Sequence, residues 1–362
     1  MSPYISSSTG RKMNELSGRL VQDLFKKYYS TVDSFGIKRI SNRELAFTAF
    51  GKQGMVRHTS FPDMASLVEY VRNNTPLHFY YSSAYYQNPE ASMDSKKWTG
   101  ADLIFDIDGD HIEGAETMSY SEMLEAVKSE LNKLLTLLTD DLSIDRKNLE
   151  VVFSGSRGYH VHVYSIFEGL ESQERREIVD YISGRCISSG YRPIVKTRWD
   201  ERINKVKENL MQIIDSQDRK WRQKIEEATG EMTGNLGKRE IKKSDYVERN
   251  ARQIAVRRYS SRIDEPVTID IHRLIRTPGS LHGKSGLQVK VLQFEKLDEF
   301  NPLNDAIPQT FHDDYEIAVT KKISIEFDGE KRELQEGKYV LPAYSSLFAV
   351  LKGSAEFVGP AK

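Results

Sequence analysis

The stretch ADLIFDIDGD, residues 101–110, decides the fold, because an apolar run ends in three carboxylates within six residues. Successive side chains of a strand face opposite ways, so Asp106 and Asp108 share one face while Phe105 and Ile107 share the other. Like charges at such neighbouring positions repel each other, and a divalent cation is a common remedy. The stretch therefore predicts a strand that ends in a cation site, although a solvated strand end capping the next turn would show the same pattern.

Mg²⁺ would suit such a site. This ion is bound through one or two carboxylates and keeps its other positions for water and substrate phosphates, so acids at i and i+2 leave it accessible. Asp110 and His111 lie past the turn and are interpreted as loop residues.

Composition narrows the class of protein. The 362 residues allow two domains, or one large domain with an insertion. Lys and Arg total 52 against 53 Asp and Glu, a net charge of -1, so any nucleic-acid surface must be a local patch. The single Cys186 excludes an internal disulfide framework and any zinc site with two or more thiolates. With no long apolar run and no apolar leader, we expect a soluble cytoplasmic protein without a membrane partner.

Periodicity predicts alternating helices and strands along the chain. A capping box, Ser119 with Glu122, opens one amphipathic helix whose apolar stripe should pack on a sheet. Apolar spacing predicts helices at 13–32, 63–74 and 119–142, and strands at 44–50, 55–61, 76–86, 101–108, 149–155, 159–164, 267–276 and 287–294. We expect an α/β (α+β) fold with mixed or antiparallel sheets flanked by helices.

A charge-dense segment divides the chain. Residues 197–256 are rich in Lys, Arg and Glu and predict a helical insertion subdomain. We expect residues 13–196 and 257–350 to form the core, with a flexible tail at 1–12.

The turn SGSRGYH, residues 154–160, is the second unusual stretch. Its glycines allow a close approach of the backbone to a ligand, and Arg157 can contact phosphate oxygens in a bidentate fork. His160 could point into the same site, while a structural role is favoured for His162. A plain hairpin would also accommodate this turn, so the turn alone does not establish a phosphate site.

A second stretch with phosphate-binding features supports it. This stretch is RIDEPVTIDIHRLIRTPGSLHGKSGLQV, residues 262–289. Its loop combines glycines with cations, which again suggests phosphate binding. A two-metal site needs a further carboxylate to bridge its ions, and both Asp264 and Asp270 qualify by spacing.

Taken together, these stretches resemble the catalytic small subunit of the archaeal and eukaryotic DNA primase. The blocks DLIFDID, VVFSGSRGYHVHV and RIDEPVT to RLIRTPGSLHGKSGL occur in the family's order, and RELAFTAF to MVRHTSF matches a fourth block upstream. The likeness spans residues 40 to 290 and implies a primase-type catalytic core carrying the helical insertion.

The resemblance implies a metal-binding set. In that family two aspartates on one strand and a third on a distant strand bind two metal ions, and the blocks place them at Asp106, Asp108 and Asp264. Asp264 is favoured over Asp270 because its interval to His282 matches the family's interval to a nucleotide-binding histidine. Two Mg²⁺ or Mn²⁺ ions are the expected cofactors.

The resemblance also implies nucleotide contacts. They are Ser154, Arg157 and His160 in the first turn, then Arg276, His282 and Lys284 on the triphosphate. Glu44 and Arg57 match positions near a second nucleotide and the primer end, although a strand-edge ion pair and a solvated arginine would explain them equally well.

The implied activity is DNA-templated synthesis of short RNA or DNA primers from nucleoside triphosphates, which initiates DNA replication. The implied partners are a primase large subunit, in a heterodimer, and a single-stranded DNA template. Many relatives carry zinc-binding cysteines shortly after the Asp-x-Asp strand, but the corresponding stretch here has none, so no structural zinc is expected. This absence and the style of the blocks favour an archaeal source.

Two alternatives stay open. One is a polymerase of the same superfamily that extends or fills ends, like the polymerase module of bacterial end-joining ligases. The other is a non-catalytic nucleic-acid-binding subunit that kept the fold, which would be indifferent to Mg²⁺ or Mn²⁺.

Overall fold

The structure is a computed structural model that describes residues 13–52, 54–188, 196–213, 223–225 and 242–361. The expected tail at 1–12 lies outside the described residues. The described α-helices are α1 (Glu15–Tyr29), α2 (Met64–Asn74), α3 (Tyr120–Thr136), α4 (Ser172–Ile182), α5 (Arg185–Ser188), α6 (Arg198–Ile213), α8 (Lys243–Tyr259), α9 (Glu265–Ile269), α10 (Pro302–Asp305) and α11 (Ala343–Leu351). Within these residues, no helix is both long and apolar enough to span a bilayer.

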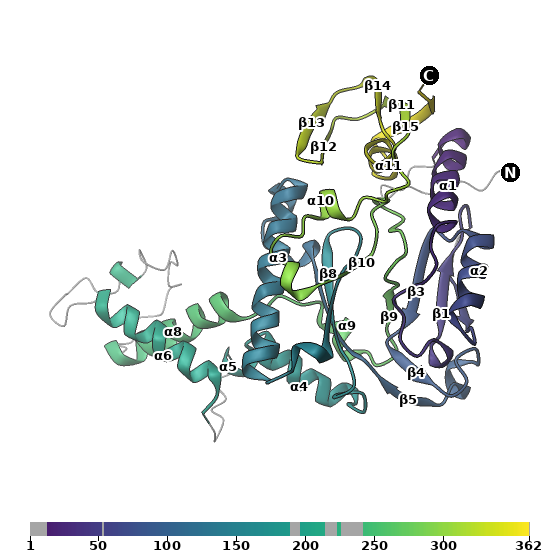
Figure 1. Cartoon of the computed structure of the whole chain (residues 1–362). Coiled ribbons are helices and arrows are strands. Elements are labelled where there is room, and N and C mark those ends of the chain that lie inside the picture. The colour runs from purple at the N-terminus through teal and green to yellow at the C-terminus, as the bar shows by residue number, and fades with distance from the viewer. Residues whose placement is uncertain (1–12, 53, 189–195, 214–222, 226–241, 362) are drawn as a thin grey trace.

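The strands form several small sheets whose pairings, within the described residues, are antiparallel. The strands are β1 (Leu45–Thr48), β2 (Val56–Thr59), β3 (His78–Ser82), β4 (Ala84–Tyr86), β5 (Trp98–Ala101), β6 (Leu103–Asp108), β7 (Leu149–Phe153), β8 (Gly158–Val163), β9 (Leu274–Arg276), β10 (Lys290–Leu292), β11 (Asp314–Val319), β12 (Ile323–Phe327), β13 (Glu330–Leu334), β14 (Gly337–Pro342) and β15 (Ala355–Pro360). The predicted fold class, sheets flanked by helices, is confirmed (Figure 1).

The Asp-x-Asp strand β6 lies at the edge of a four-stranded sheet with the order β10-β7-β8-β6. Register places Asp106 opposite His160 and Asp108 opposite Gly158. Phe105 and Ile107, on the other face, are wholly buried. The predicted alternation therefore holds, with an apolar face towards the core and an acidic face turned away from it.

Helix α3 covers the apolar face of this sheet. Its predicted capping box is present, because Ser119 and Glu122 each accept a hydrogen bond from the other's backbone. The predicted stripe, from Met123 and Val127 to Leu131, is buried. Burial of such side chains is worth about 1.5 to 3 kcal/mol each, which fixes β6 against the helix.

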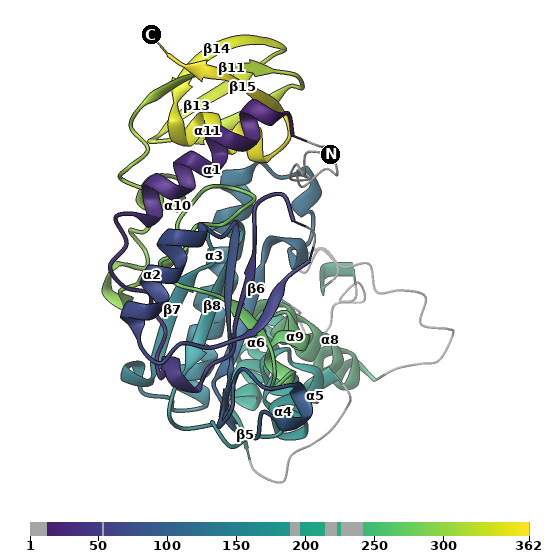
Figure 2. The same cartoon turned by 90° about the vertical axis from the view of Figure 1, so that its right-hand side faces the viewer.

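A second four-stranded sheet, in the order β2-β1-β3-β9, stands beside the first. The two strands predicted at 44–50 and 55–61 pair here as the antiparallel hairpin β1–β2, and β9 is joined to β3 with Arg276 opposite Tyr80. Helix α2 packs on this sheet through Tyr70, whose ring lies 5.0 Å from that of Phe47. Figure 2 shows α1 and α2 together on the outer side of these strands.

The segment at 267–276 differs from its prediction. Strand alternation was expected throughout, but Glu265–Ile269 is helix α9 and the strand is limited to Leu274–Arg276. Pro266 explains the difference, because its fixed φ suits the first turn of a helix. The family pattern implied that Asp264 lies on a distant strand, but Asp264 is instead the residue that precedes helix α9.

Residues 314–360 form a C-terminal unit of the sheet β14-β11-β15, the β12–β13 hairpin and helix α11. The unit lies at one end of the molecule, with α1 beside it (Figures 1 and 2). Helix α11 is almost wholly buried. Its Leu347 fills the space beside Gly286, where an added Cβ would lie 2.5 Å from Leu347 Cδ2. The C-terminal unit is thus packed directly on the glycine-rich loop.

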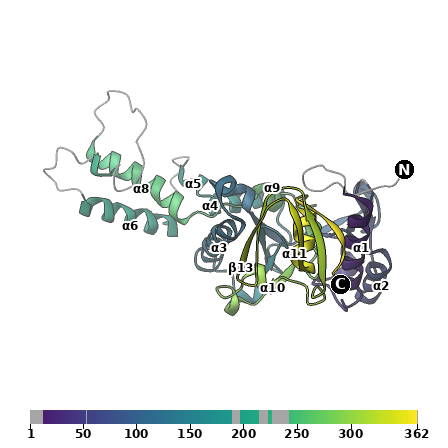
Figure 3. The same ribbon diagram turned by 90° about the horizontal axis from the view of Figure 1, so that it is seen from above.

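Helices α6 and α8 run alongside each other and extend away from the sheets, as Figures 1 and 3 show. Trp199 anchors the base of α6, where it is wholly buried and donates to the Tyr181 carbonyl at 3.1 Å. Helix α6 falls within the predicted insertion at 197–256, whereas α8 continues past its end to Tyr259. Part of the predicted segment lies outside the described residues. The division into domains stays a prediction.

Candidate active site

A cleft of about 620 Å³ gathers most of the predicted site residues. The polar side chains that line it are His78, Tyr80, Asp106, Asp108, Asp110, Ser154, Ser156, Arg157, His160, Arg273, Arg276, His282, Lys284 and Lys352. They come from β6 and the turn after it, the turn between β7 and β8, β8 itself, β3, the segment of β9, the glycine-rich loop after β9 and the C-terminal end of α11. Acids and cations from distant parts of the chain thus share one space.

The acids meet at the end of β6. Asp106 and Asp108 line the cleft, as their shared strand face predicts. Asp264 is brought beside them because its backbone N–H donates to the Asp106 carbonyl at 2.7 Å. Asp108 also accepts from the backbone N–H of Asp110 at 3.0 Å, so the turn-capping role considered for this strand end is present as well.

Asp106 is costly to ionise in this setting. Burial raises the pKa of Asp106 to about 7, and the charges of Asp108 and Asp264 add to the effect. Arg273 and Arg276 oppose it without cancelling it. The ionised form of Asp106 therefore stays unfavourable despite the two nearby arginines.

The donor chemistry fits a hard divalent cation, since carboxylate oxygens are the ligands that Mg²⁺ and Mn²⁺ prefer. Asp106 and Asp108 face the cleft, while Asp264 is adjacent through its backbone and is not among the lining residues. Among the described residues, no three His, Cys, Asp or Glu side chains already stand grouped as a metal site. The fit rests on uncompensated charge at Asp106 and on two acids sharing a strand face.

The predicted phosphate turn touches the second glycine-rich loop. Gly155 has φ +82°, and an added Cβ would lie 2.8 Å from the Cβ of His282, so glycine is required there. Ser285 Oγ donates to the Gly155 carbonyl at 2.5 Å. Arg157 in this turn donates to Asp110 at 2.6 Å and lies 3.6 Å from Asp108. The two loops form one wall of the cleft.

The histidines of the cleft are neutral. Burial, with Arg276 adding to it, lowers the pKa of His160 to about 3, so its 3.7 Å approach to Asp106 is not an ion pair at neutral pH. Burial also lowers the pKa of His282 well below its usual value. The Nδ1 of His282 accepts from the Lys284 backbone N–H at 3.1 Å, which leaves the proton on Nε2. His282 is thus a neutral donor.

Arg276 is oriented by His78 and Tyr80, two residues that the sequence analysis did not predict to belong to the site. The guanidinium of Arg276 donates to His78 Nδ1 and to Tyr80 Oη, both at 3.0 Å. Burial, with Arg276 and Lys284 adding to it, lowers the pKa of His78 to about 3, so His78 acts as an acceptor. The signal was present in the alternation of residues 78–82, which puts both side chains on one face.

Glu44 and Arg57 lie together but outside the residues that line the cleft. Arg57 Nε is 3.0 Å from the wholly buried Glu44 carboxylate, and Lys96 lies 3.3 Å from it. Burial raises the pKa of Glu44, but hydrogen bonds from Arg57 and from the His58 backbone outweigh it, so the net pKa is lowered. The ion pair considered for these residues is present, and a role near a second nucleotide stays a prediction.

His162 and Asp270 belong to the framework. His162 is wholly buried, with its ring stacked between Tyr81 and Tyr164. Asp270 accepts from the His272 backbone at 2.9 Å and is absent from the cleft lining. Of the two acids considered, Asp264 is the one held beside Asp106.

Comparisons with known proteins identify the family of the chain. The family model "DNA primase small subunit" matches residues 105–293. "DNA primase small subunit PriS" of Thermoplasma volcanium is 38% identical over 92% of this chain and 96% of that protein. The protein of the same name from Methanococcoides burtonii is 37% identical over 93% and 97% of the two chains. The chain belongs to the DNA primase small-subunit family.

One solved structure is also similar. The polymerase domain of Mycobacterium tuberculosis ligase D in complex with DNA aligns over 83% of this chain and 87% of its own, with 12% identity and a TM-score of 0.39.

Proposed function

We propose that this chain is the catalytic subunit of a DNA primase, which joins nucleoside triphosphates into short primers on a DNA template. The observation that carries the proposal is the cleft itself, which the two acids of β6 share with cations from four other segments. A nucleoside triphosphate with a divalent cation complements both sets of charges.

Asp106, Asp108 and Asp264 would hold two Mg²⁺ or Mn²⁺ ions. Bound there, such ions would lower the pKa of an attacking hydroxyl and would neutralise charge on the attacked and leaving phosphate oxygens. The raised pKa of Asp106 supports this assignment, because a cation would relieve the repulsion from its two neighbours.

The chain's own cations would bind and orient the triphosphate. Arg157, now paired with Asp110, can exchange that carboxylate for phosphate oxygens. Arg276 is already oriented by its two acceptors on β3, so its side chain loses little conformational freedom when it binds phosphate. Neutral His282 can donate from Nε2, and Lys284 adds a point charge. Donors fixed before reaction are the ones that stabilise developing charge most effectively.

Template, primer and partner follow from the same proposal. Base pairing reads the sequence, so the protein needs only contacts to the nucleic-acid backbone. The relatives are named small subunits, and we infer that this chain also works with a large subunit on single-stranded DNA.

Primer synthesis on unprimed single-stranded DNA, with labelled nucleoside triphosphates and Mg²⁺ or Mn²⁺, tests the proposal. Wild type should give short products, and the Asp106→Ala/Asp108→Ala variant should give none while keeping its circular dichroism spectrum. Equal synthesis by the two proteins would reject the assignment of the acids. Synthesis by wild type only from a supplied primer, unchanged after a large subunit is added, would favour an end-extending polymerase.

A further inference from the structure

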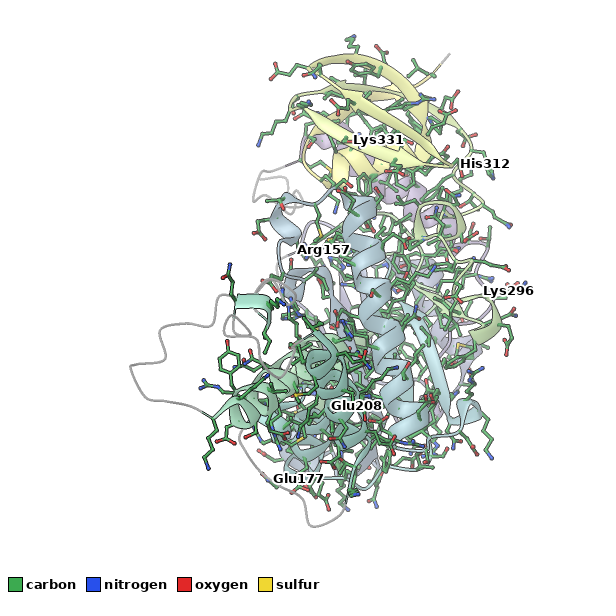
Figure 4. All side chains as sticks on the ribbon, turned by 90° about the vertical axis from the view of Figure 1, so that its left-hand side faces the viewer. Arg157, Glu177, Glu208, Lys296, His312 and Lys331 are labelled. Carbon is green, nitrogen blue, oxygen red and sulfur yellow. The ribbon has the colours of Figure 1, made fainter. Side chains whose placement is uncertain are left out.

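Lys352 lines the cleft although it belongs to the C-terminal unit. It is the C-cap residue that follows helix α11, and it lies well beyond the segment that matches the family model. Its side chain shares the cleft with Arg157 and Lys284, which come from the two glycine-rich turns. In Figure 4 Arg157 lies on the side of the core that faces this unit, whose hairpin carries Lys331.

Aromatic side chains hold Lys352 in this place. Its Nζ lies 5.2 Å from the ring centroid of Tyr120 and 5.0 Å from that of Phe348. Tyr120 is itself fixed, because its hydroxyl donates to the Ser156 carbonyl at 2.5 Å. Such cation–π contacts orient an ammonium group without neutralising it. Lys352 is therefore tied to the turn that carries Arg157.

The charged groups nearest to Lys352 are cations. Burial lowers the pKa of Lys352 to about 8, and Arg157 and Lys284 add to the effect. Among the described residues, neither a carboxylate nor a carbonyl lies at bonding distance from its Nζ. A half-buried ammonium beside two further cations is unfavourable unless an anionic ligand joins them.

We propose that Lys352 binds the phosphates of the nucleoside triphosphate, so that the C-terminal unit contributes a cation to the nucleotide site. The inference rests on the proposed function and extends the site beyond the turns recognised in the sequence. The packing of Leu347 against Gly286 supports it, since α11 is thereby fixed to the loop of His282 and Lys284.

A different role would be purely structural. A lysine at the end of a helix can stabilise the partial negative charge there. The backbone N–H of Lys352 caps α11 by donating to the Phe348 carbonyl at 2.9 Å. Its Nζ lies instead near the rings of Tyr120 and Phe348, and among the described contacts it makes no hydrogen bond to the last carbonyls of α11. The structural role predicts a change in stability and the proposed role a change in phosphate affinity.

Titration calorimetry with ATP and with AMP, in Mg²⁺, separates these roles. Lys352→Met should weaken ATP binding roughly 10-fold, because a hydrogen bond to a charged group is lost, and should change AMP binding less than twofold. Lys352→Arg should restore most of the ATP affinity. Lys338→Met is the matched control, since Lys338 belongs to the same unit but is 67% exposed and paired with Glu316.

Equal ATP affinity in wild type and Lys352→Met would overturn the inference, and a lower melting temperature with unchanged affinity would assign Lys352 to the helix end. An equal loss for AMP and ATP would also overturn it, because the contact would not be to the outer phosphates. If wild type makes no primers and binds no ATP, the proposed function itself fails. Primer synthesis by wild type with an insensitive Lys352→Met variant rejects this inference alone.

Discussion

Replacing Asp106 with asparagine should stabilise the metal-free protein at neutral and alkaline pH while abolishing synthesis. Asparagine keeps the shape of the side chain and removes its charge. That charge is held in the folded protein against burial and against the carboxylates of Asp108 and Asp264. The residue that we assign to metal binding is therefore expected to weaken the fold when no metal is bound.

The magnitude follows from the pKa of Asp106, which rises from 3.8 to about 7 on folding. One pKa unit corresponds to about 1.4 kcal/mol, so keeping the carboxylate ionised above pH 7 costs the folded state at most about 4 kcal/mol. The raised pKa means that this cost is absent below pH 4, grows between pH 4 and pH 7, and is complete above pH 7. Allowing for water around the partly accessible carboxylate, we expect a gain of about 2 kcal/mol for Asp106→Asn at pH 8.

Thermal and denaturant unfolding in EDTA, at pH 4.5 and at pH 8, measures this difference. Asp106→Asn should be more stable than wild type at pH 8, and at pH 4.5 most of the difference should be gone. Asp33→Asn is the control, because the Asp33 side chain is 92% exposed and should change stability by less than about 0.5 kcal/mol. A variant less stable than wild type at pH 8, or a difference independent of pH, would refute the reasoning.

Three further outcomes are expected. Mg²⁺ at pH 8 should raise the melting temperature of wild type but not that of Asp106→Asn, because only the former can bind the ion in its folded state; equal shifts would contradict this. Tyr80→Phe should raise the KM for nucleoside triphosphates about 10-fold by freeing Arg276, with melting temperature as control, and an unchanged KM would remove Tyr80 from this role. Gly155→Ala should cost about 1 to 3 kcal/mol in unfolding experiments and displace His282; a neutral variant would disprove the need for glycine at φ +82°.

The sequence predicted the parts of the site that depend on local pattern. Strand alternation placed Asp106 and Asp108 on one face, and the glycine-containing turn placed Arg157 in the same cleft. These features need only a period of two and a turn that tolerates positive φ, and both can be read within about ten residues. Helix α3 was equally accessible, because its capping box marks its start.

Features that depend on packing were predicted less well. The alternation at 267–276 fits a strand, but Pro266 begins a helix there, and the backbone of Asp264 is joined to β6 by a single long-range hydrogen bond. An ion pair was one of the explanations considered for Glu44 and Arg57, but no local pattern indicated that buried Lys96 would join it. The periodicity of a sequence cannot predict such contacts, because the partners lie on different elements.

Lys352 shows most clearly why the rest of the site escaped the sequence. Near the end of a chain, a lysine after an apolar helix is an ordinary solvated cation or helix cap by every local criterion. Only the packing of α11 on the glycine-rich loop carries it to Arg157 and Lys284, where three like charges share one wall. Asp106 in the same cleft is costly to ionise beside Asp108 and Asp264, and Arg157 is the cation that already contacts acids, at Asp110 and Asp108. A fold that keeps a buried acid and a half-buried lysine in one cleft is best explained by a ligand that brings phosphates to the cations and metal ions to the acids.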